Sequence, residues 1–552
     1  MARLAILTFL LNASLVALLV PGSASLPWLA VETLVLVGLF LWLPARWLRW
    51  GLAWGVGLLY GLSALFVVLD SVVRASLGRP LNLYLDVSIV QASIDILVSN
   101  VGWPGTAFLC VLGITLCLLL AALMSRLLLG IGELQQRVPH RPLTLGLVSL
   151  LIAGLVVPLP LVGATAVRLG AFQAEHALEA QQASQRFRER LSLRASPSSQ
   201  GVVALEALSG TTVLLAFVES YGVSALFDER YRPTVSPSLE SLLTAVEQRG
   251  FHVVSGRLRS PVQGGQSWLA HGTLLSGLWI DSQQDYDALL ASRSSTLIQD
   301  FQRTGHESVA VMPAITMAWP EGRALGYDRI LDADNLGYLG PNLNWVTMPD
   351  QYTWSRMHEV VLGTAKAPVF AELSLISSHA PWVPVLPVLD DWTSIGRGEV
   401  FEPWRQAGEA PASLWQDPQR VRQHYALAIA YSLDVIAGYI ANRMDERTLL
   451  VIVGDHQPAP LVTGDGASRD VPVHLISANR RQLEPFAGIN GEGGLSGFRA
   501  GIWPDPEKPG LGMDQLRPFL HRHFGARGNI PHLGHLPLNP VQEKLTDLNN
   551  NQ

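Results

Sequence analysis

Long apolar runs crowd into the first 165 residues of the chain. Each approaches the roughly 20 residues that a helix needs to cross the hydrocarbon core of a bilayer. Hydrophobic residues make up 49% of the chain and charged residues only 15%, which is too apolar for an ordinary soluble enzyme. The sequence therefore predicts five transmembrane helices, at 4–20, 28–45, 51–69, 105–128 and 143–164.

Basic residues near the ends of these runs indicate the orientation. They precede the first run, separate the second from the third, and separate the fourth from the fifth, at Arg3, Arg46, Arg49, Arg126, Arg137 and Arg141. Because such residues stay in the cytoplasm, the N-terminus is expected inside and everything after about residue 165 outside. Alternatively, the first run is a signal peptide cleaved near 22–25, which would leave the remaining topology unchanged.

The runs divide the chain into a membrane domain (1–165), a polar linker helix (166–205) and an extracytoplasmic domain (206–552). Within the first part, 81–98 has apolar residues at helical spacing and predicts an amphipathic helix, either on the outer membrane surface or packed on the bundle. Both cysteines, Cys110 and Cys117, fall in the fourth run, so the exported domain cannot use disulfides. Net charge −6 and the absence of a basic tract argue against nucleic acid as a partner.

Two apolar strands of the exported domain end in metal-binding residue types. Leu449–Val453 is followed by Gly454, Asp455 and His456, and Thr211–Val218 is followed by Glu219. Carboxylates and imidazoles at the carboxyl ends of parallel strands could share a divalent cation. Each alone is equally consistent with a polar turn. Strands alternate with a helix at 237–249, which predicts an α/β domain with a mainly parallel central sheet.

A glycine-rich turn supplies a nucleophile of the right type. Gly264-Gly265 leads into a helix with Ser267 near its start, where free N–H groups and the helix dipole favour an anion or an ionised hydroxyl. A simple helix cap is the alternative role for Ser267.

In order and spacing these motifs resemble the sulfatase-like branch of the alkaline phosphatase superfamily. More closely, the chain resembles the lipoteichoic acid synthase and phosphoglycerol transferase group, whose members carry a catalytic domain outside the membrane after five spans. The resemblance implies that Glu219, Ser267, Asp455 and His456 hold one metal ion, usually manganese, with zinc or magnesium as alternatives. It also implies that Ser267 is the nucleophile.

Further segments extend the resemblance. The stretch 372–382 is similar to a strand whose Ser-His-x-Pro end carries a phosphate-contacting histidine, here His379. Trp319 and Arg323 resemble a substrate-contacting pair, although the arginine stands at an unusual offset from the tryptophan. His474, on a late strand, is interpreted as structural.

The combined features predict a phosphotransferase of a bacterial cytoplasmic membrane, acting at its outer face. It would move a phosphoglycerol-type group from a membrane lipid to an envelope glycan or lipid through Ser267. A sulfatase is disfavoured because formylglycine maturation needs proline and arginine where Leu269 and His271 stand. A phosphate ester hydrolase, a phosphoethanolamine transferase and an envelope binding protein without activity remain alternatives.

Overall fold

The computed structural model describes residues 1–18, 28–135, 162–163, 165–194, 201–292, 294–487 and 495–526. Contacts within the chain divide it into two compact units, Met1–Arg186 and Phe187–Gln552. The division falls inside the predicted linker, within the long helix α6 (Thr165–Arg194). Each unit has its own hydrophobic core.

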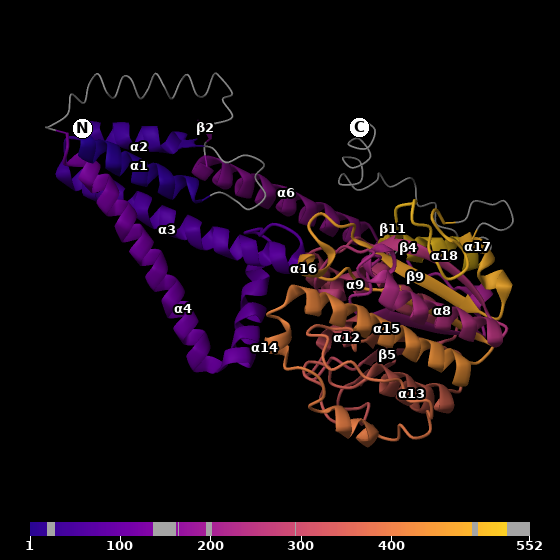
Figure 1. The fold of residues 1–552 in the computed structure, drawn as a ribbon. Helices are drawn as coiled ribbons and strands as arrows, with labels where there is room; N and C mark the ends of the chain where they lie inside the picture. The colour runs from indigo at the N-terminus through magenta and orange to yellow at the C-terminus, as the bar shows by residue number, and fades with distance from the viewer. Residues whose placement is uncertain are drawn as a thin grey trace. The chain divides into compact units, whose positions relative to one another are not determined.

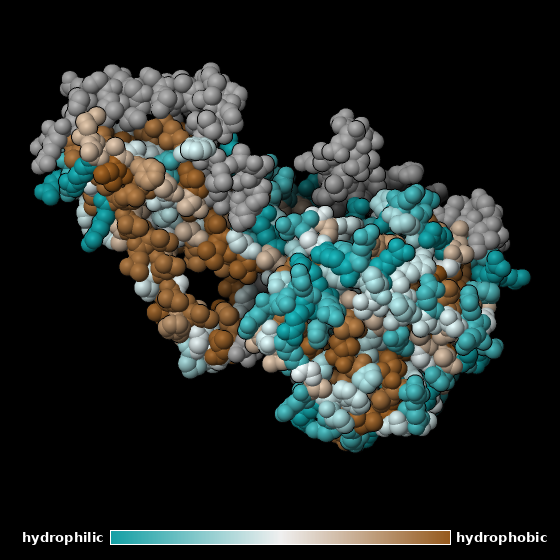
Figure 2. All heavy atoms as spheres, viewed as in Figure 1, coloured by the Kyte–Doolittle hydropathy of each residue, from teal (hydrophilic) through white to brown (hydrophobic). Residues whose placement is uncertain are grey.

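The first unit is built from apolar helices (Figure 1). Its elements are α1 (Ala2–Val16), β1 (Leu29–Ala30), α2 (Val31–Trp42), α3 (Arg46–Leu77), η1 (Asp86–Ser88), α4 (Ile89–Gly132) and β2 (Val162–Gly163). Brown, hydrophobic residues cover much of the visible surface of α3 and α4 in Figure 2, and side chains such as Val111 and Leu119 are more than 60% exposed. A surface of this kind is suited to lipid and not to water.

Among the residues that the structure describes, length and composition single out three helices that could cross a membrane: Arg46–Leu77, Val101–Gly132 and Pro418–Asn442. The first two match the third and fourth predicted spans. The last is α15, which is 67% buried within the second unit and is therefore a core helix. Since α1 and α2 are shorter, and most of the fifth predicted span lies outside the described residues, the count of five spans is not established.

The segment 81–98 differs from the amphipathic helix that its spacing predicts. Helix α4 begins only at Ile89 and continues, with a kink at Gly102 (φ 71°), into the fourth apolar run. Before this helix, Arg79 forms an ion pair with Asp86, and the Asn82 side chain accepts a hydrogen bond from the N–H group of Tyr84. These local contacts fold residues 79–86 into a turn, which removes them from the expected helix.

The second unit is an α/β domain around a nine-stranded sheet. Its strands are β3 (Thr212–Val218), β4 (His252–Arg259), β5 (Glu307–Met312), β6 (Arg329–Asp332), β7 (Val369–Leu375), β8 (Thr448–Gly454), β9 (Asp470–Ser477), β10 (Arg499–Ala500) and β11 (Leu511–Gly512). The apolar runs that predict β3 and β8 are buried along almost their entire lengths, as strands covered on both faces must be.

The sheet is mixed. A parallel block runs in the order β8-β3-β7-β5-β6, with β3 at its centre between β8 and β7. Strand β9 is antiparallel to both β8 and β4, and β10 is antiparallel to β4. The sheet thus has a parallel block extended by β9, β4 and β10, which alternate in direction, so the expected mainly parallel sheet is not established.

Helices cover both faces of the sheet. One core packs α8 (Arg232–Gln248), α13 (Asp350–Val360) and α15 (Pro418–Asn442) on one face. A second core packs α9 (Ser267–Ser276), α10 (Gln283–Ala291), α11 (Leu297–Arg303) and α18 (Leu516–Phe524) on the other. Shorter helices complete the unit: α7 (Ser224–Phe227), α12 (Pro320–Leu325), α14 (Pro411–Leu414), α16 (Pro460–Thr463) and α17 (Glu484–Ala487).

Candidate metal centre and nucleophile

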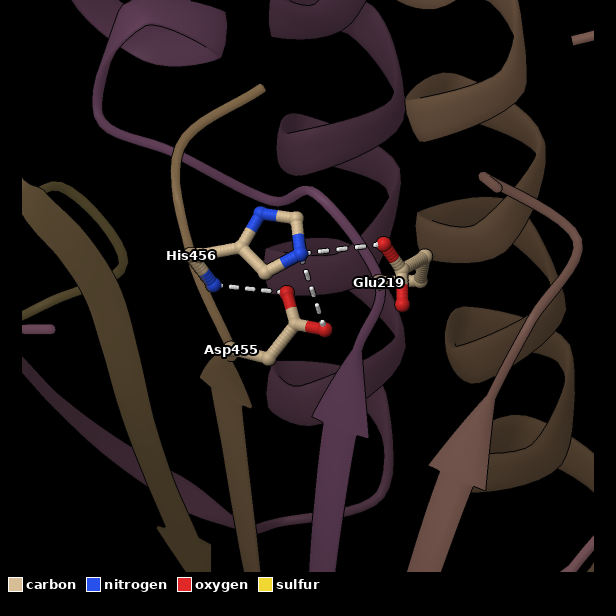
Figure 3. A group of neighbouring side chains, drawn as sticks. All are labelled: Glu219, Asp455 and His456. Carbon is tan, nitrogen blue, oxygen red and sulfur yellow. Dashed lines mark hydrogen bonds and ion pairs between the residues drawn. The ribbon is translucent and has the colours of Figure 1, made fainter. Parts of the chain in front are cut away.

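The pairing of β3 with β8 brings the predicted metal ligands together. Val218 and Gly454 are partners in the last row of this parallel pair. Glu219 follows directly on β3, and Asp455 and His456 follow on β8, so all three project from one edge of the sheet (Figure 3). Parallel strands that end in the same row must deliver their next residues to the same place.

Glu219, Asp455 and His456 form a buried cluster in which one potential ligand atom from each residue lies within 4.8 Å of the others. His456 Nε2 is 3.2 Å from Glu219 Oε1 and 3.8 Å from Asp455 Oδ2. The other ring nitrogen, Nδ1, lies 2.8 Å from the carbonyl oxygen of Gln457, while Nε2 has no hydrogen-bond partner in the described part of the chain. An imidazole fixed through Nδ1, with Nε2 free between two carboxylates, fits a divalent cation.

Electrostatics within the cluster favour a cation. Burial, reinforced by the neighbouring Glu219 charge, raises the pKa of Asp455 to about 7. Burial opposes charge on His456, yet the two carboxylates raise the pKa of this ring to about 9. Burial alone would raise the pKa of Glu219, but the charge of the neighbouring His456 holds this pKa below its usual value. A protonated histidine is therefore the positive charge that a metal ion would replace.

Backbone contacts fix the carboxylates. The N–H groups of Ser220 and His456 donate to Asp455 Oδ1 at 2.8 and 2.6 Å. The Ser378 hydroxyl donates to the carbonyl oxygen of Glu219 at 2.6 Å, which ties the β7 end to the β3 end. These bonds leave Asp455 Oδ2 facing the His456 ring.

Ser267 joins the cluster from α9. This helix begins at Ser267, directly after Gln266 in the left-handed region (φ 65°, ψ 39°). The Ser267 hydroxyl donates to Glu219 Oε2 at 3.1 Å. The structure thus assembles all four residues of the predicted metal and nucleophile set at one point, with the hydroxyl at the positive end of a helix dipole.

The predicted substrate-contacting residues differ in how the structure connects them to this group. His379 is exposed directly after Ser378, and its charge contributes to lowering the pKa of Glu219. Trp319 precedes α12 and stacks on Tyr327 with ring centroids 6.4 Å apart. Arg323 is exposed on α12, and no hydrogen bond or ion pair connects it to the cluster within the described ranges.

His474 lies in the core, as the sequence analysis interpreted it. Its ring nitrogens contact the Tyr221 hydroxyl at 3.0 Å and the Ser255 hydroxyl at 2.8 Å. Burial lowers the pKa of His474 to about 3, so it is a neutral structural imidazole.

A second polar group lies beneath α9 and escaped the sequence analysis. His271 Nδ1 is 2.7 Å from Glu372 Oε1, and the Tyr327 hydroxyl donates to the other oxygen of Glu372. Two signals could have found it: a histidine four residues after the nucleophile, and a carboxylate in the middle of the apolar strand β7.

No protein-family model matches the chain, and no curated protein sequence is similar to it. Among solved structures, the lipoteichoic acid synthase LtaP from Listeria monocytogenes is 13% identical, with 62% of this chain and 78% of that chain covered and a TM-score of 0.40. The phosphoglycerol transferase GacH from Streptococcus pyogenes, in complex with sn-glycerol-1-phosphate, is 12% identical, with 67% and 84% covered and a TM-score of 0.39.

A third similar structure is a protein in the alkaline phosphatase superfamily from Vibrio parahaemolyticus, with 14% identity, coverage of 53% and 68%, and a TM-score of 0.35. The chain is thus similar, at low identity, to solved structures from the group that its sequence motifs resemble.

Proposed function

We propose that the protein is a membrane-anchored, metal-dependent phosphotransferase that works through a covalent Ser267 intermediate. The observation that carries this proposal is the meeting of Ser267 with Glu219, Asp455 and His456, where the serine hydroxyl is 3.1 Å from one carboxylate of a three-ligand group. A divalent ion there, which we expect to be manganese with zinc or magnesium as alternatives, would act as a Lewis acid beside the phosphoryl group.

The side chains supply positioning and charge. Ser267 attacks phosphorus from the start of α9, where the helix dipole stabilises its developing negative charge. The side chain of His379 is exposed, directly after Ser378, and is therefore available to contact the phosphoryl oxygens. Trp319 and Arg323 are assigned to the remainder of the donor on the basis of the motif alone.

We infer that the donor is a membrane phospholipid with a phosphoglycerol-type head group and that the acceptor is an envelope glycan or lipid. The lipid-compatible helices α3 and α4 support a donor drawn from a bilayer. We place the protein in a bacterial cytoplasmic membrane with the catalytic unit on the outer side, because the basic residues of the first unit favour that orientation.

The proposal is tested with the full chain in vesicles of phosphatidylglycerol labelled in the head group, with manganese present. Mass spectrometry of the digested protein should find a phosphoglycerol adduct on Ser267, and the lipid extract should contain diacylglycerol. Release of diacylglycerol without any acceptor product, but with free glycerol phosphate, would identify a hydrolase instead.

Ser267→Ala is the control variant for this experiment. It should fold and retain the metal, since Glu219, Asp455 and His456 stay in place, but it should form no adduct and release no diacylglycerol. Undiminished turnover by Ser267→Ala would show that Ser267 is not the nucleophile.

A further inference from the structure

Helix α9 presents a second functional side chain on the same face as Ser267. His271 follows Ser267 by four residues, and residues at this spacing are neighbours about 5–6 Å apart on a helix surface. Helical side chains also lean toward the N-terminus of their helix, so His271 leans toward the turn that carries Ser267. The ring stacks on Phe217 of β3, with centroids 3.7 Å apart and planes 14° apart, while Ser267 contacts Glu219 two residues further along the chain.

A buried carboxylate fixes the orientation of the His271 ring. Glu372 is only 1% exposed and lies 2.7 Å from His271 Nδ1. Its second oxygen already accepts a hydrogen bond from the Tyr327 hydroxyl group. A carboxylate in this position only accepts hydrogen bonds, so Nδ1 must be the donor. With Nδ1 as the donor, the neutral tautomer has its lone pair on Nε2.

The Nε2 atom of His271 is therefore a potential proton acceptor that receives no hydrogen bond. It is buried and has no hydrogen-bond partner among the residues that the structure describes. An unpaired buried polar atom costs stability, and a catalytic role is one reason for a protein to keep it.

Two other buried histidines show what distinguishes this one. His474 has both ring nitrogens paired to hydroxyl groups. His306 has one nitrogen bound to the carbonyl oxygen of Thr211 and the other unpaired, but it lies at the amino-terminal edge of the sheet, where β3 and β5 begin. Only His271 in this comparison combines a free nitrogen, a carboxylate partner and a place on the nucleophile's own helix.

We propose that His271, oriented by Glu372, is the general base that takes the proton of the Ser267 hydroxyl. This inference rests on the proposed function and deepens it. As the Ser267 Oγ–phosphorus bond forms, the Oγ proton moves to His271 Nε2; the bond from phosphorus to the leaving oxygen breaks, and this oxygen keeps the electron pair and takes a proton from water. When the acceptor hydroxyl later attacks phosphorus, it gives up its proton to the solvent, the Oγ–phosphorus bond breaks, and the proton held on His271 returns to Oγ. The arrangement follows the logic of nucleophile, base and orienting carboxylate.

The contact that Ser267 makes in this structure explains why another acceptor is needed. Its hydroxyl donates to Glu219, a member of the cation-binding group. A carboxylate engaged with a cation is a poor final acceptor for that proton. His271 is the free acceptor that the same helix provides.

The test measures the reactivity of Ser267 directly. The purified full chain, loaded with manganese, is treated with a fluorophosphonate, and the adduct on Ser267 is counted by mass spectrometry over time. The labelling forms the Oγ–phosphorus bond and expels fluoride, so it requires removal of the Oγ proton but no lipid donor and no acceptor.

His271→Asn is the informative variant, because the asparagine amide replaces Nδ1 as the donor to Glu372 and removes only the Nε2 base. We expect its maximal labelling rate to fall by about 10²-fold or more, with an unchanged half-saturating probe concentration and unchanged manganese content. His306→Asn, a buried histidine with the same pattern of one bound and one free nitrogen, is the matched control and should label like the wild type.

Glu372→Gln provides an independent measurement if His271→Asn does not fold. It keeps the shape of the side chain and should lower the maximal rate about 10-fold or more without changing the half-saturating concentration. Labelling of a folded His271→Asn variant at the wild-type rate would overturn the assignment, and so would loss of labelling that is matched by loss of manganese. A wild type that does not label at Ser267 would also overturn it.

The fluorophosphonate result separates this inference from the proposed function. If the wild type labels at Ser267 in a His271-dependent way but transfers nothing from phosphatidylglycerol, the general base stands and the choice of donor was wrong. If transfer occurs and is insensitive to His271→Asn, the phosphotransferase stands and the general base fails.

Discussion

At the scale of single residues, the site is defined by charges that are held apart from water. Asp455 and Glu219 are both buried, and the charge of His456 offsets much of their mutual repulsion. Such an arrangement stabilises a bound cation and destabilises the protein without one. A cation held by this cluster would therefore be bound at the expense of the stability of the metal-free fold.

Replacing Asp455 with Asn should make the metal-free protein more stable. The pKa of Asp455 rises from an ordinary 3.8 to about 7 in the folded state, so folding loses stability as the pH rises through this interval, and the loss is complete above about 7. The neutral asparagine keeps the Oδ1 acceptor and avoids the loss. We expect a gain of about 2–4 kcal/mol in the free energy of unfolding at pH 8 and little change below pH 4, measured by urea denaturation in chelator.

Manganese should reverse this ranking, since Asp455→Asn loses a ligand and with it the stabilisation by bound metal. Asp228→Asn serves as the control with the opposite sign, because the partner Arg230 lowers the pKa of Asp228. An Asp455→Asn variant that is less stable than the wild type in chelator at pH 8 would remove charge repulsion from the account of this site.

The sequence predicted the residues of the metal centre because each stands directly after an apolar strand or a glycine-rich turn. It did not predict the His271–Glu372 pair, whose members are 101 positions apart and meet only because α9 packs across β3 and β7. Their chemistry is visible in the sequence as a carboxylate inside an apolar strand, but the identity of its partner depends on packing.

At the scale of elements, the backbone geometry of the site depends on the last residue of β8, Gly454. A Cβ atom on Gly454 would lie 1.9 Å from the carbonyl oxygen of Tyr221, on the segment that follows Glu219. Only glycine lets the chain after β8 and the chain after β3 approach this closely. The approach brings Asp455 to the Ser220 N–H group.

Gly454→Ala should therefore damage the centre without touching any ligand. We expect a loss of about 1–3 kcal/mol in unfolding free energy and a clear fall in manganese affinity, measured by calorimetric titration, because Asp455 and Glu219 must move apart. Gly363→Ala is the matched control, since a Cβ atom there would meet only the His358 carbonyl oxygen at an ordinary 3.5 Å. Unchanged manganese affinity in Gly454→Ala would show that the site tolerates displacement of this turn.

The elements themselves were predicted unevenly, and the reasons are physical. The strands β3 and β8 and the start of α9 were located correctly, because apolar runs and a glycine pair mark them. The reversed direction of β9 was not foreseen, since all eight of its residues are buried and burial on both faces of a strand carries no sign of its direction. Helix α8 begins at Arg232, ahead of the predicted 237, because Pro233 is tolerated in its first turn and Pro237 is accommodated inside the helix.

At the scale of the whole molecule, contacts within the first unit indicate which of its helix ends lie on the same side of the membrane. Arg3 at the N-terminus is 3.2 Å from Glu133 at the end of α4, and the Arg49 guanidinium donates to the carbonyl oxygen of Gly132. The N-terminus, the connection before α3 and the end of α4 are thus gathered at one end of this unit. These are the positions where the basic residues lie, as expected for a cytoplasmic side.

The orientation can be tested with single cysteines after Cys110 and Cys117 are replaced by serine. Ala45→Cys lies between α2 and α3, at the end of the first unit where the N-terminus and the end of α4 also lie. Lys366→Cys is exposed in the second unit. An impermeant maleimide applied to intact spheroplasts should label Lys366→Cys at once and Ala45→Cys only after the membrane is opened. The reverse pattern would put the catalytic unit in the cytoplasm. The proposed acceptors, glycans and lipids of the envelope, would then be out of its reach, whereas a soluble phosphate ester would not.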